Sequence, residues 1–193
     1  MSFPVSIHEG NLVWSGEHWI NALRLDGVEE PSAWISLFHT RYSPVGEGTA
    51  AQIFIPEAEV NVVCADQADV GQFTIDYFFS NTKFIKPAEE VMRAEFNCSG
   101  DIRSNPAWTI TTDSFRIVAR WRVAEPPVIA DGTFRYGTEH FTLLFFTAVA
   151  TVEFNGRKID GHPFQRDIWQ PSIGDLRSSC LFALSETMIE LPD

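Results

Sequence analysis

Cysteine is scarce in this sequence, and no two cysteines form a closely spaced pair. Among 193 residues only Cys64, Cys98 and Cys180 occur, and none belongs to a CxxC motif. An odd number of widely spaced cysteines excludes a zinc ribbon and a disulfide framework. We therefore expect three reduced thiols, buried in strands as free cysteines usually are.

Basic residues are also few. The chain has 14 Lys and Arg against 26 Asp and Glu, a formal net charge of −12 at pH 7. Nucleic acids and anionic membrane surfaces attract basic patches, so we expect neither as a partner. No run of eighteen apolar residues suggests a membrane-spanning helix. The opening segment MSFPVSIHEG lacks the basic and apolar regions of a signal peptide, which predicts a cytoplasmic protein.

Common catalytic and cofactor motifs are missing as well. The sequence contains no GxSxG, P-loop, GxGxxG or HExxH motif. No two of its five histidines are spaced i, i+2 or i, i+4, as a compact local metal site would require. We therefore predict no metal and no cofactor.

Aromatic residues, in contrast, are abundant. Sixteen Phe and six Trp suit the pleated surface of β-sheets and wide apolar interiors. The segment Thr138–Phe154 is an unusually long run of strand-forming residues. It ends at Asn155-Gly156, a pair that strongly favours a two-residue hairpin turn.

Alternation of apolar and polar residues predicts about a dozen strands with short turns. Only Pro87–Ala94 has a helical pattern, because proline suits a first helical turn and two glutamates favour the positive end of the dipole. The predicted strands span residues 12–14, 19–25, 33–41, 51–55, 60–65, 72–79, 95–98, 108–112, 114–123, 133–136, 138–154, 157–159, 164–169 and 178–184.

This pattern predicts an all-β protein with one short helix, folded as a single domain over residues 1–193. A closed antiparallel β-barrel and a two-sheet sandwich both fit such a series of strands. The long strand 138–154 favours the barrel, because long strands bend where a sheet curls, here near Ala148 or Ala150.

Candidate catalytic residues gather near the end of the predicted strand 164–169. Asp167 could act as a general base or orient His162, and on an extended strand it would share a face with Trp169. An Arg166–Asp167 pair with a tryptophan closing one barrel end explains the same residues without chemistry. His140 is a third candidate, since its register points it among apolar residues.

Candidate ligand-binding residues are the large rings that could line a barrel interior, together with one arginine that could contact an anionic group. The same rings could equally fill the interior as a core. The set comprises Phe73, Tyr77, Phe79, Trp121, Phe146, Trp169 and Arg120.

The segment Phe141–Trp169 resembles the lipocalin-like proteins of the AttH and hydroxyneurosporene synthase group. The resemblance rests on the long strand, Asn155-Gly156, Asp160-Gly161 and the element Arg166-Asp167-Ile168-Trp169. It covers about thirty residues, and Gln170-Pro171 stands where that group carries a glycine after the tryptophan. The resemblance implies a calycin-type barrel that holds a hydrophobic ligand of isoprenoid type, and it carries over no activity.

Three interpretations of function stay open. The first is a protein that binds a small hydrophobic or amphipathic molecule in its interior. The second is an acid–base enzyme, such as a hydratase, isomerase or cyclase, acting on an isoprenoid-like or aromatic substrate through Asp167 with His162 or His140. The third is a structural protein that self-associates, for instance as a homodimer, without a ligand.

Overall fold

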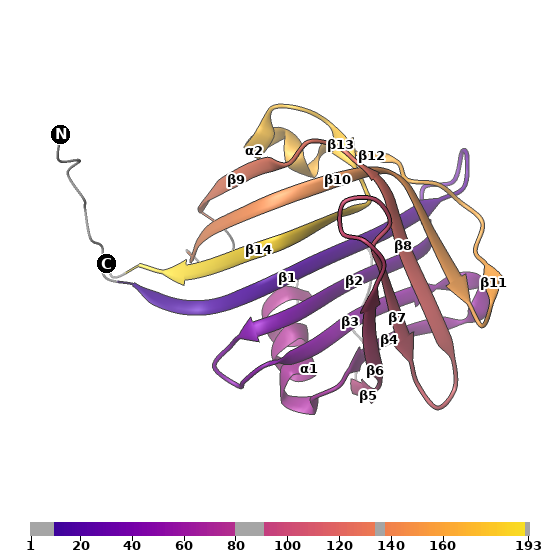
Figure 1. Ribbon diagram of the computed structural model, residues 1–193, viewed down its shortest axis with the longest axis horizontal. Helices are drawn as coiled ribbons and strands as arrows, with labels where there is room; N and C mark the ends of the chain where they lie inside the picture. The colour runs from indigo at the N-terminus through magenta and orange to yellow at the C-terminus, as the bar shows by residue number, and fades with distance from the viewer. Residues whose placement is uncertain (1–9, 80–90, 134–137, 192–193) are drawn as a thin grey trace.

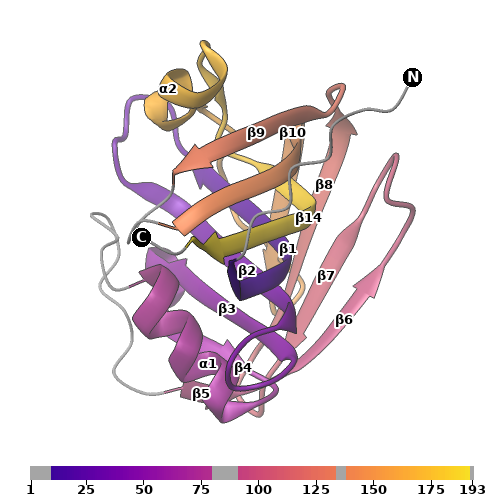
Figure 2. The ribbon, with the colours of Figure 1, turned by 90° about the vertical axis from the view of Figure 1, so that its left-hand side faces the viewer.

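The computed structural model describes residues 10–79, 91–133 and 138–191. One large, mostly antiparallel sheet dominates the chain and curls into a nearly closed barrel, as Figures 1 and 2 show. Neighbouring strands follow the order β5-β4-β3-β2-β1-β14-β10-β8-β7-β6, while β9 and β11 pair with β10 outside this path. The predicted all-β antiparallel barrel is therefore confirmed.

The strands vary from two residues to seventeen residues in length. The large sheet contains β1 (Asn11–Arg24), β2 (Pro31–Tyr42), β3 (Gly48–Ile55), β4 (Val60–Ala65), β5 (Val91–Arg93), β6 (Glu95–Ser99), β7 (Ala107–Thr111), β8 (Arg116–Ala124), β9 (Val128–Thr133), β10 (Thr138–Phe154), β11 (Arg157–Lys158) and β14 (Leu181–Glu190). A separate ribbon pairs β12 (Gln165–Arg166) with β13 (Arg177–Ser178).

Helical structure is short and lies outside the barrel. The α-helices are α1 (Ala68–Thr74) and α2 (Gln170–Ile173). A π-helical turn (Ile75–Phe79) extends α1, and single 3-10 turns occupy Pro56–Ala58 and Asp167–Trp169. Figure 2 shows α1 and α2 on the same side of the sheet, towards its opposite ends.

The two ends of the sheet meet at Ala94. This residue alone separates β5 from β6, and its backbone N–H donates to the carbonyl oxygen of Ala65 at the end of β4. β5 runs parallel to β4, whereas the other paired strands are antiparallel. The chain thus passes from one edge of the sheet to the other without a loop, which brings the barrel close to closure.

Strand β10 belongs to both walls of the barrel. Its first part, up to Phe146, pairs with β14 and β9, and from Thr147 onwards it pairs with β8. The change of partner falls beside Ala148, one of the two predicted bend points. Asn155 and Gly156 have φ angles of 50° and 80°, as the predicted two-residue turn requires.

Large rings fill the space between the strands. Trp19 is fully buried, and its ring centroid lies 4.5 Å from that of Phe182 and 5.2 Å from that of Trp121. The Trp121 indole N–H donates to the carbonyl oxygen of Ile20, so its polar edge is satisfied. Inward-facing aliphatic residues of β2, β3, β7, β8 and β10 complete this core.

The outer face of the same sheet carries two further apolar clusters. One, near α1, contains Trp14, Phe38, Phe79 and Met188. The other, near α2, contains Ile20, Leu144, Phe146 and Leu181, with Phe164 and Ile173 packed against it. Strands β1, β2, β10 and β14 are therefore covered on both faces along much of their length.

Three sequence-based predictions of local structure are wrong. Residues 72–79 are helical, because the buried positions Val70, Thr74 and Phe78 follow a helical spacing that a short apolar run does not distinguish from a strand. The predicted helix Pro87–Ala94 is contradicted at Val91–Arg93, which pair with β4, and its residues 87–90 lie outside the described part.

The third error concerns residues 164–169. Only Gln165 and Arg166 are extended there, because their partner β13 is two residues long, and a 3-10 turn begins at Asp167. Asp167 and Trp169 therefore do not share a face of an extended strand. Among the cysteines, Cys64 and Cys180 are buried as expected, but Cys98 is exposed.

We expect Trp19→Ala to destabilise the protein by about 3–5 kcal/mol, because no neighbour can refill the space of a fully buried indole. Phe141→Ala is the matched control, since Phe141 is 51% exposed, and we expect a change within about 0.5 kcal/mol. Urea denaturation of both variants measures the difference. Equal destabilisation would contradict the assignment of Trp19 to the barrel core.

Candidate functional site

Polar side chains cross the outer face of five neighbouring strands, between the two outer apolar clusters. Backbone pairing aligns them, since Gln52 on β3 is opposite Ser36 on β2, and Thr142 on β10 is opposite Glu186 on β14. We call this set the outer polar row. It consists of Gln52, Ser36, His18, Glu186, Thr142 and His140.

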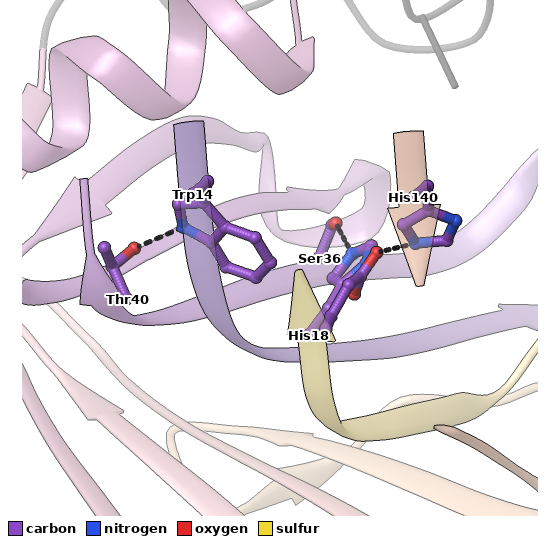
Figure 3. A network of polar contacts seen from close by, with 6 residues as sticks. Trp14, His18, Ser36, Thr40 and His140 are labelled. Carbon is purple, nitrogen blue, oxygen red and sulfur yellow. Dashed lines mark hydrogen bonds and ion pairs between the residues drawn. The ribbon is translucent and has the colours of Figure 1, made fainter. Parts of the chain in front are cut away.

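Glu186 lies at the centre of the outer polar row and contacts two imidazoles. His140 donates from Nε2 to Oε1 of Glu186 over 2.7 Å. Nδ1 of His18 lies 3.5 Å from the other carboxylate oxygen, Oε2. The second ring nitrogen of His18, Nε2, lies 3.0 Å from Oγ of Ser36. Figure 3 shows His18 between Ser36 and His140.

The Glu186 carboxylate is buried, with only 5% of the residue exposed. Burial by itself raises the pKa of Glu186, because it disfavours the charged form. The hydrogen bond from His140 and the close approach of His18, together with their charge, outweigh burial and lower this pKa to about 2. Glu186 is therefore an anion throughout the physiological pH range.

Three members of the outer polar row carry buried side-chain atoms without a hydrogen-bond partner: Gln52, Thr142 and Glu186, whose Oε2 has only the ion pair with His18 at 3.5 Å. Gln52 is 1% exposed, and neither its amide nitrogen nor its amide oxygen is bonded. Thr142 is fully buried, and its hydroxyl oxygen is likewise unbonded. Buried polar groups in folded proteins are nearly always paired, so each unpaired group calls for an explanation.

Apolar rings border the row on the α1 side. The imidazole of His18 stacks on the ring of Phe38, with centroids 3.9 Å apart. Phe38 in turn stacks on Phe78 from the π-helical turn. Beside them, the Trp14 indole N–H donates to Oγ1 of Thr40, as Figure 3 also shows. Stacking and hydrogen bonding together fix the orientation of the His18 ring.

Of the three candidate catalytic residues, the structure places only His140 in this row. It lies on the outer face of β10 rather than in the barrel interior, and it contacts Glu186. His162 is 54% exposed and pairs with the exposed Asp26 at 3.3 Å. Asp167 is exposed at the start of its 3-10 turn. The three residues therefore do not form one cluster.

The candidate ligand-binding residues are distributed among separate parts of the molecule. Trp121 belongs to the barrel core, and Phe146 to the outer cluster near α2. Phe73, Tyr77 and Phe79 come from α1 and its π-helical extension, beside the other outer cluster.

The two remaining candidates differ in what the structure describes. Arg120 forms an ion pair with Glu153 at 2.6 Å on the outside of the barrel. The backbone of Trp169 belongs to the 3-10 turn, and its side chain lies outside the described part of the structure.

A surface pocket of about 270 Å³ is lined by Ala65–Ala68, Val91 and Arg93, none of which belongs to the outer polar row. Residues 10–79, 91–133 and 138–191 contain no group of three or more His, Cys, Asp or Glu arranged to hold a metal ion. None of their helices is both long enough and apolar enough to cross a bilayer.

Comparison with known proteins returned no match to a family model, a curated protein or a solved structure. The geometry of the outer polar row is therefore the basis for assigning a function.

Sequence analysis selected only His140 from this row and missed the other five members: Gln52, Ser36, His18, Glu186 and Thr142. Glu186 lies beyond the predicted end of its strand at residue 184, whereas β14 continues to Glu190. Had the predicted strand continued beyond residue 184, alternation would have placed Glu186 on the same face as the apolar Met188. That placement would have indicated a charged group on an apolar face. The pairing of Glu186 with His18 and His140 depends on strand order, which no local pattern reveals.

We expect acid to destabilise the protein through Glu186. Its folded pKa of about 2 is below the ordinary value of 4.5, so its contribution is complete above pH 4.5 and is lost as the pH falls towards 2. The loss of this contribution lowers the free energy of unfolding by about 3 kcal/mol. Chemical denaturation at several pH values should show that acid lowers the free energy of unfolding less in Glu186→Gln than in the wild type.

Glu190→Gln is the control for this measurement, because Glu190 is an exposed residue of the same strand. It should retain the wild-type pH profile. A Glu186→Gln profile parallel to that of the wild type would contradict the role of Glu186 as a buried, compensated anion.

Proposed function

We propose that the protein binds a small, largely apolar molecule on the outer face of its sheet, and that the outer polar row recognises the polar groups of this molecule. The observation that carries the proposal is the unpaired amide of Gln52, buried opposite Ser36, whose hydroxyl contacts His18. Small-molecule sites are typically apolar surfaces with a few placed polar groups, and the outer polar row between two apolar clusters has that composition.

The energetic argument concerns the unliganded protein. Leaving a buried donor or acceptor unpaired costs about 1–3 kcal/mol for each group. Gln52 contributes one donor and one acceptor, and Thr142 contributes a hydroxyl. A ligand that offers complementary groups recovers this free energy on binding, and it discriminates against analogues that lack those groups.

This proposal moves the ligand from the barrel interior to its outer face. The described interior positions are occupied by packed rings, among them Trp19, Trp121 and Phe182. A small-molecule role also agrees with the resemblance to lipocalin-like proteins, and we retain a calycin-type relationship as part of the proposal. A cytoplasmic location and a homodimer also stay predictions.

Gln52→Leu tests the proposal with two opposite effects. Removing the unpaired amide should raise the free energy of unfolding of the unliganded protein by about 1–3 kcal/mol. The same change should abolish the thermal shift caused by any compound that stabilises the wild type in a screen of fatty acids, terpenoids and aromatic acids. Differential scanning fluorimetry and native mass spectrometry provide the two readouts.

Gln72→Leu is the control, since Gln72 is an exposed residue of α1. It should leave the ligand response intact. Two results would contradict the proposal: a ligand response that persists in Gln52→Leu, or a loss of stability in the unliganded variant, which would mean that the amide is satisfied in the native protein.

A second candidate function follows from the order of contacts Ser36–His18–Glu186. With the His18 proton on Nδ1, its Nε2 accepts from the Ser36 hydroxyl while Nδ1 faces the carboxylate. These are the positions of nucleophile, base and orienting acid in serine hydrolases. His140 holds the other oxygen of Glu186 and so fixes the acid. The second candidate is therefore an acyl-transfer enzyme with Ser36 as nucleophile.

A fluorophosphonate probe tests this candidate. Oγ of Ser36 forms a bond to phosphorus, the P–F bond breaks with release of fluoride, and His18 Nε2 takes the hydroxyl proton. We expect labelling of Ser36, none in Ser36→Ala, and a rate lower by at least about 100-fold in Glu186→Gln. Ser185→Ala, at an exposed position of β14, should label normally. Peptide mass spectrometry that finds Ser36 unlabelled would exclude it as a nucleophile.

A further inference from the structure

Three arginines lie over three aromatic rings at the α2 end of the sheet. The guanidinium carbon of Arg166 is 5.0 Å from the ring centroid of Trp34, and that of Arg177 is 5.8 Å from the ring of Phe146. Arg24 lies 4.3 Å from the ring of Phe164. These rings belong to, or pack against, the outer cluster near α2. In a chain with a net charge of −12, such a concentration of cations on one apolar surface is unusual.

Arg166 and Arg177 are direct neighbours on the small β12–β13 ribbon. Their Cα atoms are register partners, which places the two side chains on the same side of the ribbon. Like charges directly opposite each other in a sheet are destabilising. The pair therefore carries a cost that a bound anion would remove.

The carboxylates of the described residues compensate only part of this charge. Glu125 pairs with Nη1 of Arg177 at 3.2 Å. Arg24 and Arg166 have no carboxylate within 4.0 Å in the described part of the chain, and Asp167, next to Arg166 in sequence, is exposed. Burial lowers the pKa of Arg166, although the charge of Asp167 acts in the opposite direction. The Arg166 cation is thus partly desolvated without an ion-pair partner.

Two unpaired donors belong to the neighbours of Arg166: the Trp34 ring under its guanidinium, and its register partner Arg177. Nε1 of Trp34 and Nε of Arg177 are both inaccessible to solvent and have no acceptor. Both atoms can only donate, so the complementary group must be an acceptor. The indole N–H of Trp34, the Nε–H of Arg177 and the guanidinium of Arg166 match the lone pairs of a carboxylate or a phosphate.

We propose that Arg166, Arg177 and Trp34 form a binding site for an oxyanion, either a carboxylate or a phosphate group. The two guanidinium groups supply the charge, while the indole N–H and Arg177 Nε donate hydrogen bonds. The site is independent of the outer polar row, although Trp34 and Ser36 share one face of β2. It also differs from Arg120, the arginine that sequence analysis selected, which Glu153 neutralises.

Titration with inorganic phosphate and, separately, with benzoate tests the site. Differential scanning fluorimetry should show a saturable rise in melting temperature, measured against sodium chloride at equal ionic strength because salt alone screens surface charge. Arg166→Gln and Arg177→Gln should each raise the apparent Kd by about 10-fold or more, because each removes a charged hydrogen bond.

Arg122→Gln is the matched control, since it removes the same charge from an exposed position on β8 and should change the Kd by no more than about twofold. Trp34→Phe keeps the ring under Arg166 but removes Nε1–H, and it should weaken binding by about threefold or more. This variant keeps the test valid if an arginine variant fails to fold.

The probe that binds with the lower Kd identifies the kind of anion, because the oxygens of phosphate are arranged tetrahedrally and those of the benzoate carboxylate lie in a plane. Either result supports the site if Arg166→Gln weakens the response. Two results would overturn the proposal: no saturable response to either anion, or the same response in Arg166→Gln and Arg122→Gln.

Discussion

A buried carboxylate, Glu186, is the interaction on which the outer face of this barrel depends. A charge removed from water must be compensated locally, and here two imidazoles provide the compensation. Because His18, Glu186 and His140 come from three adjacent strands, the arrangement requires the sheet order β1-β14-β10. The burial of Glu186 therefore depends on the strand order, because only this order brings both imidazoles to the carboxylate.

The two faces of the sheet differ in how their side chains are packed and paired. The inner face carries packed rings and aliphatic side chains. Its Trp121 indole N–H donates to the backbone of Ile20, whereas the indole nitrogen of Trp108 in the same core is buried and unpaired. The outer face combines two apolar clusters with polar groups, several of which are unpaired. Close packing inside the barrel stabilises the fold, and the unpaired groups outside it are the features that a ligand could use. Apart from Trp108, the unpaired buried groups of the described residues belong to the outer side of the sheet, which is why both proposed sites lie there.

Local pattern predicted much of the barrel and little of its chemistry. The bounds of Val60–Ala65 and Thr138–Phe154, and the turn at Asn155-Gly156, follow from alternation and turn preference. Residues 72–79 were misassigned, since a short apolar run fits both a strand and a helix. Ser36 and Glu186 became neighbours of His18 only through long-range pairing, which sequence spacing does not encode.

The central claim is that Glu186 is a buried anion held between two imidazoles. Carbon-13 NMR of its side-chain carboxyl, followed as a function of pH in the folded protein, tests this claim most directly. The account predicts that Glu186 is still ionised at about pH 3.5, because its pKa is lowered to about 2. A titration midpoint at or above the ordinary value of 4.5 would show that burial dominates, and it would contradict the account.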